Sequence, residues 1–109
     1  MSGTELGRFE HLLLRAVMRL GDNAYGMTIR QELAHHTGRE IAVGAIYTAM
    51  ARLEVRGFIK SKLGDPTPER GGRAKRFYRV LPAGTKAMAK AEAALLGLSR
   101  AIARDPEKS

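Results

Sequence analysis

The stretch from Val43 to Leu81 constrains the fold most strongly, because three differently patterned segments follow one another in it without a linker. In the first segment, residues 43–56, apolar side chains recur at the spacing of one helix face: Ile46, Met50 and Leu53. Gly57 follows, and glycine favours the end of a helix because it adopts left-handed conformations easily. The pattern predicts a helix over 43–56 that buries one face.

The opposite face of this predicted helix carries small side chains near its N-terminus and cations towards its C-terminus. It is formed by Ala45, Thr48, Arg52 and Arg56. One face therefore suits a hydrophobic core, and the other is able to enter a groove.

Residues 58–63 and 76–81 are short runs of aromatic, β-branched and alternating cationic residues. Such runs predict two half-buried antiparallel strands. The segment between them, 64–75, is too long for a tight hairpin turn, so we expect an extended wing. It carries three residues that we call the wing cations: Arg70, Arg73 and Lys75.

A first helix is expected from about Leu6 to Gly21, where apolar residues recur at helical spacing. On a helical wheel Leu14 and Met18 lie nearly opposite its apolar stripe. We interpret them as contacts with a second packing partner. The alternative is that they are isolated apolar residues on the surface, which are common in soluble proteins.

A short helix is expected from Met27 to His36, in which Thr28 and Gln31 have the spacing of a capping box. This helix and the helix over 43–56 have the order and size of a helix-turn-helix. Together with the strand pair, they predict a fold that is mainly α with a small antiparallel β-hairpin, a winged helix-turn-helix.

A last helix is expected over 82–104, because Pro82 suits the first helical position and apolar residues recur behind it at alternating spacings of three and four. These residues are Met88, Ala91, Leu95, Leu98 and Ile102. The seam favours a dimer if Leu14 and Met18 join the same interface. The alternative is a helix that folds back on its own domain.

The length of 109 residues suits one small domain, in which 6–81 is the winged unit, 82–104 the dimerisation helix, and 1–5 and 105–109 are tails. The chain has 19 Lys and Arg against 11 Asp and Glu, so its net charge is +8. This charge fits a polyanion, although acidic proteins and membrane surfaces attract it as well. Without cysteine or an apolar run near the ~20 residues of a membrane span, a cytoplasmic protein with no membrane partner is expected.

Catalysis and metal binding are not expected from this sequence. His35 and His36 point to different sides of a helix, and His11 is distant from both. Segment 64–72 lacks the Gly-Lys-Ser/Thr of a phosphate-binding loop, and the serines have no nucleophile context. No enzyme activity, metal or cofactor is therefore predicted.

Several short motifs between Leu12 and Ala89 resemble, in order, the PadR family of bacterial winged-helix transcriptional regulators. The motifs are Tyr25-Gly26, Gly44-Ala45-Ile46-Tyr47, Met50, Arg52-Leu53-Glu54, Gly57-Phe58-Ile59 and Gly72-Arg73-Ala74-Lys75-Arg76-Phe77-Tyr78-Arg79. The resemblance implies DNA binding, a homodimer formed through the last helix and the first helix, usually repression, and a possible small-molecule effector at the dimer interface. The chain resembles the short class, which has no long C-terminal domain.

Two departures from the family pattern concern the site. Leu81 replaces the threonine that commonly precedes the last helix, which removes a capping side chain expected to contribute ~1 kcal/mol. Thr48 stands where the family often has proline after the recognition-helix tyrosine. Its hydroxyl can reach a phosphate or a base edge, so local DNA contacts are expected to differ.

Arg52 is best suited to read a base, because a guanidinium can bond guanine O6 and N7 together in the major groove. Ala45 and Thr48 are short enough to let the helix approach closely. Tyr47 lies to one side of this face, where its hydroxyl is expected to bind a phosphate while its ring packs against the domain. The alternative is a core aromatic whose hydroxyl is satisfied within the protein. The wing cations follow the DNA backbone or enter the minor groove, unless they form a solvated basic surface.

The predicted function is a dimeric, sequence-specific DNA-binding repressor that reads an inverted repeat with recognition helices about 34 Å apart. Two alternatives stay open at this point. One is a winged-helix module that docks on protein or RNA, and the other is an architectural protein that binds double-stranded DNA with little specificity.

Overall fold

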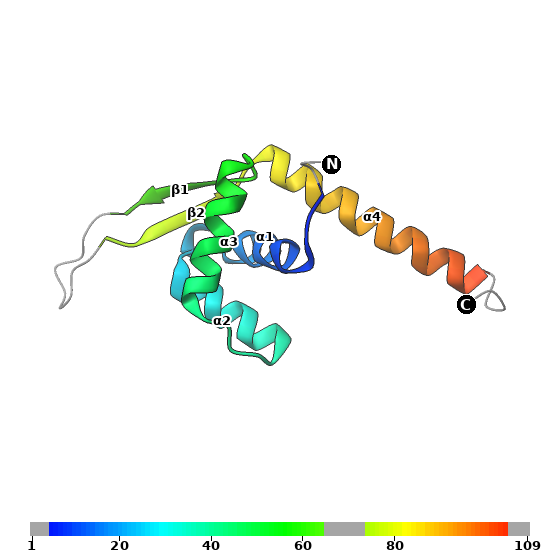
Figure 1. Cartoon of the computed structure of the whole chain (residues 1–109), viewed down its shortest axis with the longest axis horizontal. Helices are drawn as coiled ribbons and strands as arrows, with labels where there is room; N and C mark the ends of the chain where they lie inside the picture. The colour runs from blue at the N-terminus through cyan, green and yellow to red at the C-terminus, as the bar shows by residue number, and fades with distance from the viewer. Residues whose placement is uncertain (1–4, 65–73, 105–109) are drawn as a thin grey trace.

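The computed structural model describes residues 5–64 and 74–104, which form a mainly helical fold with one two-stranded antiparallel sheet (Figure 1). The elements in chain order are α1 (Arg8–Leu20), the 3₁₀ turn η1 (Gly21–Asn23), α2 (Gly26–Thr37), α3 (Val43–Val55), β1 (Ile59–Leu63), β2 (Arg76–Val80) and α4 (Pro82–Arg104). The predicted fold class is confirmed. None of the described helices is both long enough and apolar enough to cross a membrane.

The end of α3 is determined by Gly57, which has φ of 79°. The Gly57 N–H donates to the Glu54 carbonyl oxygen at 3.0 Å, and the Phe58 N–H donates to the Leu53 carbonyl oxygen at 3.0 Å. These two bonds form a Schellman motif, which satisfies carbonyls at the helix end and directs the chain into β1. Glycine is favoured here because a Cβ is strained at positive φ.

The capping box predicted for α2 is wrong. Thr28 is not the N-cap, because α2 begins before it, at Gly26, and Tyr25 occupies the N-cap position. The Thr28 hydroxyl accepts a hydrogen bond from the Tyr25 N–H at 2.9 Å and donates one to the Asn23 carbonyl oxygen at 2.5 Å. Gln31 is exposed. Thr28 therefore lies in the first turn of α2, and its hydroxyl holds the backbone of the turn between α1 and α2.

Helix α1 is the centre of the fold, since it contacts α2, α3, β2 and α4. Leu14 is 0% exposed and belongs to the core, so the prediction that it faces a second partner is wrong. The prediction assumed one covered face, whereas α1 is enclosed from several sides. The other fully buried large side chains are Leu13, Val17, Ile29, Ile46, Met50, Leu53, Ile59 and Met88.

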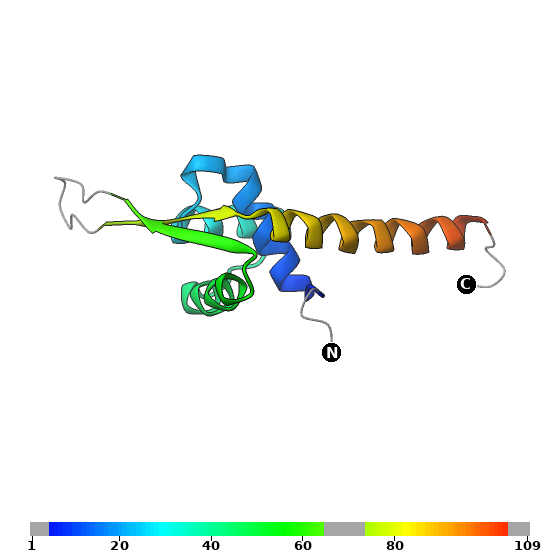
Figure 2. The same cartoon turned by 90° about the horizontal axis from the view of Figure 1, so that it is seen from above.

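The hairpin lies between α3 on one side and the turn that joins α1 to α2 on the other (Figure 2). Its strands pair Ile59 with Val80 and Ser61 with Tyr78. Because side chains alternate between the faces of a strand, the residues beside α3 differ from those beside the end of α1. The second set contains three exposed cations: Lys60, Lys62 and Arg79.

Helix α4 packs on the domain only with its first half. Gly84, Ala87 and Met88 are buried, and a Cβ at Gly84 would lie 2.4 Å from the Phe58 carbonyl oxygen. A glycine at this position therefore allows the helix to approach β1 closely. From residue 93 to Ile102 the residues are exposed, and the helix projects away from the domain on the side opposite the hairpin (Figures 1 and 2).

Candidate nucleic-acid interface

The outer face of α3 contains the side chains that were predicted to contact DNA. The inner face is buried and holds the helix on the core through Ile46, Ala49, Met50 and Leu53. Ala45, Thr48 and Arg52 are exposed. The Arg52 guanidinium forms no hydrogen bond or ion pair with any residue that the structure describes. Its guanidinium is therefore available to a ligand at no loss of internal contacts.

Tyr47 lies between the outer face of α3 and the start of α2, and its side chain is 46% exposed. Its ring packs against Gly26, where an added Cβ would lie 2.2 Å from the Tyr47 hydroxyl oxygen. The close approach of the two helices at this point requires glycine at position 26. The ring thus packs on the domain while nearly half of the residue stays exposed, and the Tyr47 hydroxyl forms no hydrogen bond with a described residue. The interpretation as a core aromatic with a satisfied hydroxyl is therefore wrong, and the phosphate contact stays a prediction.

The base of the wing is fixed to the start of α2. The Tyr78 N–H donates to the Ala24 carbonyl oxygen at 2.9 Å, and the rings of Tyr25 and Phe77 meet edge to face with centroids 5.4 Å apart. Lys75 is exposed, and its Nζ lies 4.5 Å from the centroid of the Tyr25 ring. This cation–π contact holds the Lys75 ammonium beside the helix-turn-helix. The other two wing cations, Arg70 and Arg73, lie outside the described residues.

A polar contact chain joins α3 to both strands. The Ser61 hydroxyl donates to Glu54 Oε2 at 2.9 Å and accepts a hydrogen bond from Arg76 Nη1 at 3.0 Å. A groove of about 470 Å³ lies beside these residues, and its lining includes Tyr47 and Tyr78. Burial raises the pKa of the Tyr78 phenol, so this side chain is a neutral donor at physiological pH.

Arg56 does not belong to the exposed cationic face of α3, contrary to the helical-wheel prediction. Its Nη1 binds both carboxylate oxygens of Glu10, at 2.9 and 3.0 Å, and its guanidinium lies 4.6 Å from the centre of the Phe58 ring. A further hydrogen bond reaches the Glu5 carbonyl oxygen. Arg56 therefore connects the C-terminus of α3 to the start of α1.

The seven predicted dimerisation residues differ in their burial. Leu14 and Met88 are fully buried within one protomer, at 0% and 1% exposed, so their assignment to a surface between two protomers is corrected. Ala91 is half-buried. The remaining four are exposed: Met18, Leu95, Leu98 and Ile102. Leu96, which lies outside the predicted seam, is exposed as well.

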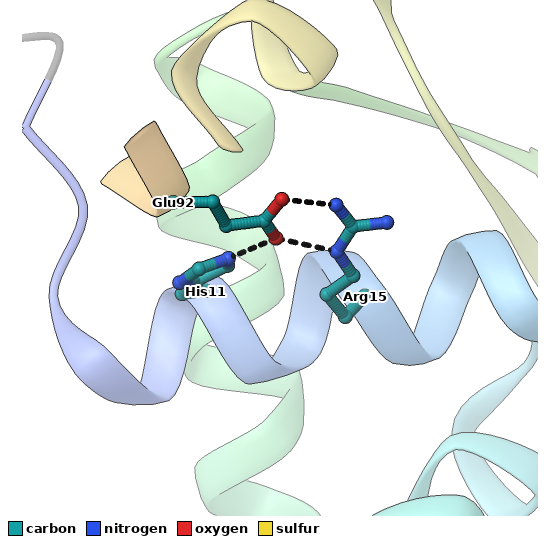
Figure 3. Close-up of polar contacts among 3 residues, drawn as sticks. All are labelled: His11, Arg15 and Glu92. Carbon is teal, nitrogen blue, oxygen red and sulfur yellow. Dashed lines mark hydrogen bonds and ion pairs between the residues drawn. The ribbon is translucent and has the colours of Figure 1, made fainter. Parts of the chain in front are cut away.

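A three-residue cluster that the sequence analysis missed joins α1 to the middle of α4 (Figure 3). Glu92 Oε2 lies 2.7 Å from His11 Nε2 and 2.6 Å from Arg15 Nε, and Glu92 Oε1 pairs with Arg15 Nη2. Hydrogen bonds from Arg15 and then His11 lower the pKa of Glu92 to about 2. A usable signal existed, because Glu92 is the only acidic residue between Pro82 and Arg104.

Of the two remaining histidines, His36 contacts a carboxylate at the surface, and His35 contacts the His36 ring. His36 Nε2 lies 2.9 Å from Glu32 Oε2, which also pairs with Arg19 Nε at 2.6 Å. The hydrogen bond from Arg19 is the main cause that lowers the pKa of Glu32. Across residues 5–64 and 74–104, no group of three His, Cys, Asp or Glu side chains is arranged to hold a metal ion.

Comparison with known proteins gives consistent matches. The family model described as the transcriptional regulator PadR-like family matches residues 13–90. The transcriptional regulator Rv3488 of Mycobacterium tuberculosis is 35% identical over 95 residues, which cover 81% of this chain and 84% of that protein.

Solved structures agree with these matches. A transcriptional regulator from Clostridium thermocellum superposes with a TM-score of 0.69 at 26% identity, covering 88% of this chain and 87% of the other. A PadR family transcriptional regulator from Eggerthella lenta superposes with a TM-score of 0.70 at 25% identity, covering 94% and 87%.

Proposed function

Because the chain belongs to the PadR-like family, whose members are transcriptional regulators and not enzymes, we propose that it is a dimeric, sequence-specific DNA-binding repressor. The observation that carries this proposal is the outer face of α3. It presents the short side chains of Ala45 and Thr48 and the unpaired guanidinium of Arg52 on a helix whose other face is buried. A rigid helix with such a face fits the major groove.

In this proposal Arg52 selects the sequence. A guanidinium that bonds guanine O6 and N7 contributes ~1–3 kcal/mol of discrimination against other bases. The internal partner that would compete for this group is absent among the described residues, which favours binding to an external acceptor. Thr48, next to it on the same face, adds a hydroxyl that can bind a phosphate or a base edge.

The wing and Tyr47 supply contacts that depend less on sequence. The Tyr47 hydroxyl lies at the edge of α3, and the Lys75 ammonium is held near the same end of the domain by Tyr25. Both groups bind phosphate oxygens in this proposal. Arg70 and Arg73 are proposed to extend this contact along the backbone or into the adjacent minor groove.

The proposed dimer forms through the exposed part of α4, where Leu95, Leu98 and Ile102 recur on one face. Two-fold symmetry then places the recognition helices about 34 Å apart, in successive major grooves, and the operator is an inverted repeat. The small-molecule effector that the resemblance implies would bind between the last helices and α1.

The test is a mobility-shift titration against the promoter of the protein's own operon and against scrambled DNA. Arg52→Ala is expected to weaken promoter binding by roughly tenfold or more, which is ~1–3 kcal/mol, with a much smaller effect on scrambled DNA. Lys75→Gln is expected to weaken binding to both DNAs alike. It should also reduce the slope of the logarithm of the binding constant against the logarithm of the salt concentration by roughly 0.9, the value for one phosphate.

The matched control is Arg100→Ala, which removes the same charge from the exposed, far part of α4 and should leave both affinities near those of the unchanged protein. Equal affinity of the unchanged protein for both DNAs would instead indicate an architectural protein. Absence of binding at low salt would indicate a docking module for protein or RNA.

A further inference from the structure

A second groove lies behind the hairpin, on the face that points away from α3, and has a volume of about 570 Å³. We call it the back groove. One wall comes from the end of α1 and from η1, and the other from the far face of β1 and β2. Its lining includes Val17, Met18, Asp22, Lys60, Lys62, Phe77 and Arg79.

Without a bound ligand, the cations of the back groove repel one another. Lys60 and Arg79 are direct cross-strand partners, and Lys62 projects from the same face of β1. Like charges directly opposite each other destabilise a strand pair. None of the three forms an ion pair with a described residue, not even with Asp22, the one carboxylate in the lining.

The DNA interface proposed above does not account for these charges. The hairpin has α3 on one side and the turn between α1 and α2 on the other (Figure 2), and the back groove opens on the second side. A duplex that receives α3 in its major groove lies on the first side. Lys60, Lys62 and Arg79 therefore have no acceptor in the proposed DNA complex.

The rest of the lining indicates the chemistry of that anion. Val17 is buried, Phe77 is half-buried, and the exposed thioether of Met18 adds an apolar surface that adapts to irregular shapes. The groove therefore combines apolar surface with a cluster of cations, and its volume lies within the range of small-molecule sites. A long polyanion would use the cations and leave the apolar wall uncovered.

We propose that the back groove binds an amphipathic organic anion, in which a carboxylate, sulfonate or phosphate ester is attached to an apolar body. The acid group lies between Lys60, Lys62 and Arg79, and the body contacts Met18 and Phe77. Met18, which the sequence suggested as a dimer contact, thus contacts a ligand within one protomer. This inference requires no operator, so it stands or fails independently of the proposed function.

The probe for the test is anilinonaphthalene sulfonate, an apolar aromatic anion whose fluorescence rises in an apolar site. The groove variant Lys60→Gln/Lys62→Gln/Arg79→Gln is expected to bind it about tenfold more weakly than the unchanged protein, as the loss of three charge pairs implies. The uncharged phenylnaphthylamine measures the apolar contribution, and its affinity should be the same for both proteins.

The chain offers a control with the same loss of charge. Lys86→Gln/Lys90→Gln/Arg100→Gln removes two lysines and one arginine that are exposed on α4, and it should bind the probe like the unchanged protein. Equal weakening in both triple variants would overturn the proposal, because net charge alone would explain it. Displacement of the probe by a random-sequence duplex from the unchanged protein, but not from the groove variant, would also overturn it in favour of a phosphate backbone.

Thermal unfolding checks whether the groove variant is folded, and it also tests the charge repulsion directly. Without ligand, the groove variant is expected to have a higher Tm than the unchanged protein, because the Lys60–Arg79 repulsion is removed. At the same concentration, the probe should raise the Tm of the unchanged protein more than that of the groove variant, which binds it more weakly. A lower Tm of the groove variant without ligand would contradict the proposed cost of the cations.

Discussion

At Gly26 the backbone of α2 comes so close to Tyr47 that only a hydrogen fits at the Cα. The Cβ of an alanine would lie 2.2 Å from the Tyr47 hydroxyl oxygen and 2.7 Å from Cζ. We expect Gly26→Ala to lower the free energy of unfolding by about 1–3 kcal/mol, the usual effect of overpacking. Urea unfolding followed by circular dichroism measures this difference.

Two further variants test the assigned cause. Gly44→Ala adds the same methyl group in α3, where no atom lies within 4 Å of the new Cβ, so stability should stay equal or rise slightly. In a Tyr47→Ala background the penalty of Gly26→Ala should largely disappear. A penalty that persists there would mean that Tyr47 is not the obstacle.

Glu92 is the residue whose charge state matters most for the attachment of α4. Its folded-state pKa of about 2 lies below the ordinary value of 4.5, so its contribution to stability is complete above pH 4.5 and is lost as pH falls towards 2. Its side chain is 33% exposed, which reduces the effect through solvent screening. We expect Glu92→Gln to lower the unfolding free energy by about 1 kcal/mol at neutral pH.

The difference between Glu92→Gln and the unchanged protein should shrink between pH 4.5 and pH 2, as measured by chemical unfolding at several pH values. Glu40→Gln is the matched control, because Glu40 pairs with Arg30 at 3.0 Å while its side chain is 84% exposed. At neutral pH, Glu40→Gln should lower the free energy of unfolding less than Glu92→Gln does. A constant difference for Glu92→Gln across the range would contradict the role given to its ionised form.

At the scale of elements, the helices and the hairpin were predictable because their signals are local. The buried and exposed faces of α3 follow from one apolar period, and Gly57 ends the helix through its own backbone preference. The start of α2 was predicted to within one residue, at Met27 instead of Gly26, but the role of Thr28 was wrong. Thr28 can act as N-cap or as N3, and spacing alone does not distinguish these positions. The hydrogen bond from the Tyr25 N–H to the Thr28 hydroxyl identifies Tyr25 as the N-cap and Thr28 as N3.

Contacts between distant elements were not predictable in the same way. The helical wheel of α1 shows two sides, but it does not show that four other elements cover the helix, and Leu14 was therefore misassigned. Arg56 and Glu10, like His11 and Glu92, are brought together only by the tertiary fold. Local periodicity contains no information about which charged residues of different elements will meet.

The shape of the whole molecule follows from its last helix. The radius of gyration is 16.5 Å and the extents are 62 × 29 × 21 Å, whereas a compact domain of this length has a radius of gyration of about 13 Å. The excess comes from the part of α4 that projects from the domain (Figure 1). An apolar helix that extends into solvent in this way favours association with a second copy.

The dimer prediction is tested at Leu98, whose side chain is 66% exposed in one protomer. Leu98→Glu is expected to raise the dimer dissociation constant by roughly tenfold or more, since two-fold symmetry places two buried charges in each interface. The fold of the protomer should stay intact because Leu98 does not belong to its core. Sedimentation equilibrium measures the association, and circular dichroism checks the fold.

Val55→Glu introduces the same charge at an apolar side chain that is 88% exposed at the end of α3. It should leave the dimer dissociation constant unchanged. If Leu98→Glu and Val55→Glu weaken association equally, or if the unchanged protein is a monomer, the interface proposed for α4 is wrong.

The contact of Glu92 with His11 and Arg15 acquires a further meaning in the proposed dimer (Figure 3). Each recognition helix would lie ~17 Å from the two-fold axis, half of the ~34 Å between successive major grooves. A tilt of ~10° between α1 and α4 would then move it by ~3 Å, nearly the ~3.4 Å of one base step. The angle between α1 and α4 would then determine which half-site spacing the dimer accepts, and the Glu92 carboxylate would limit how far that angle varies.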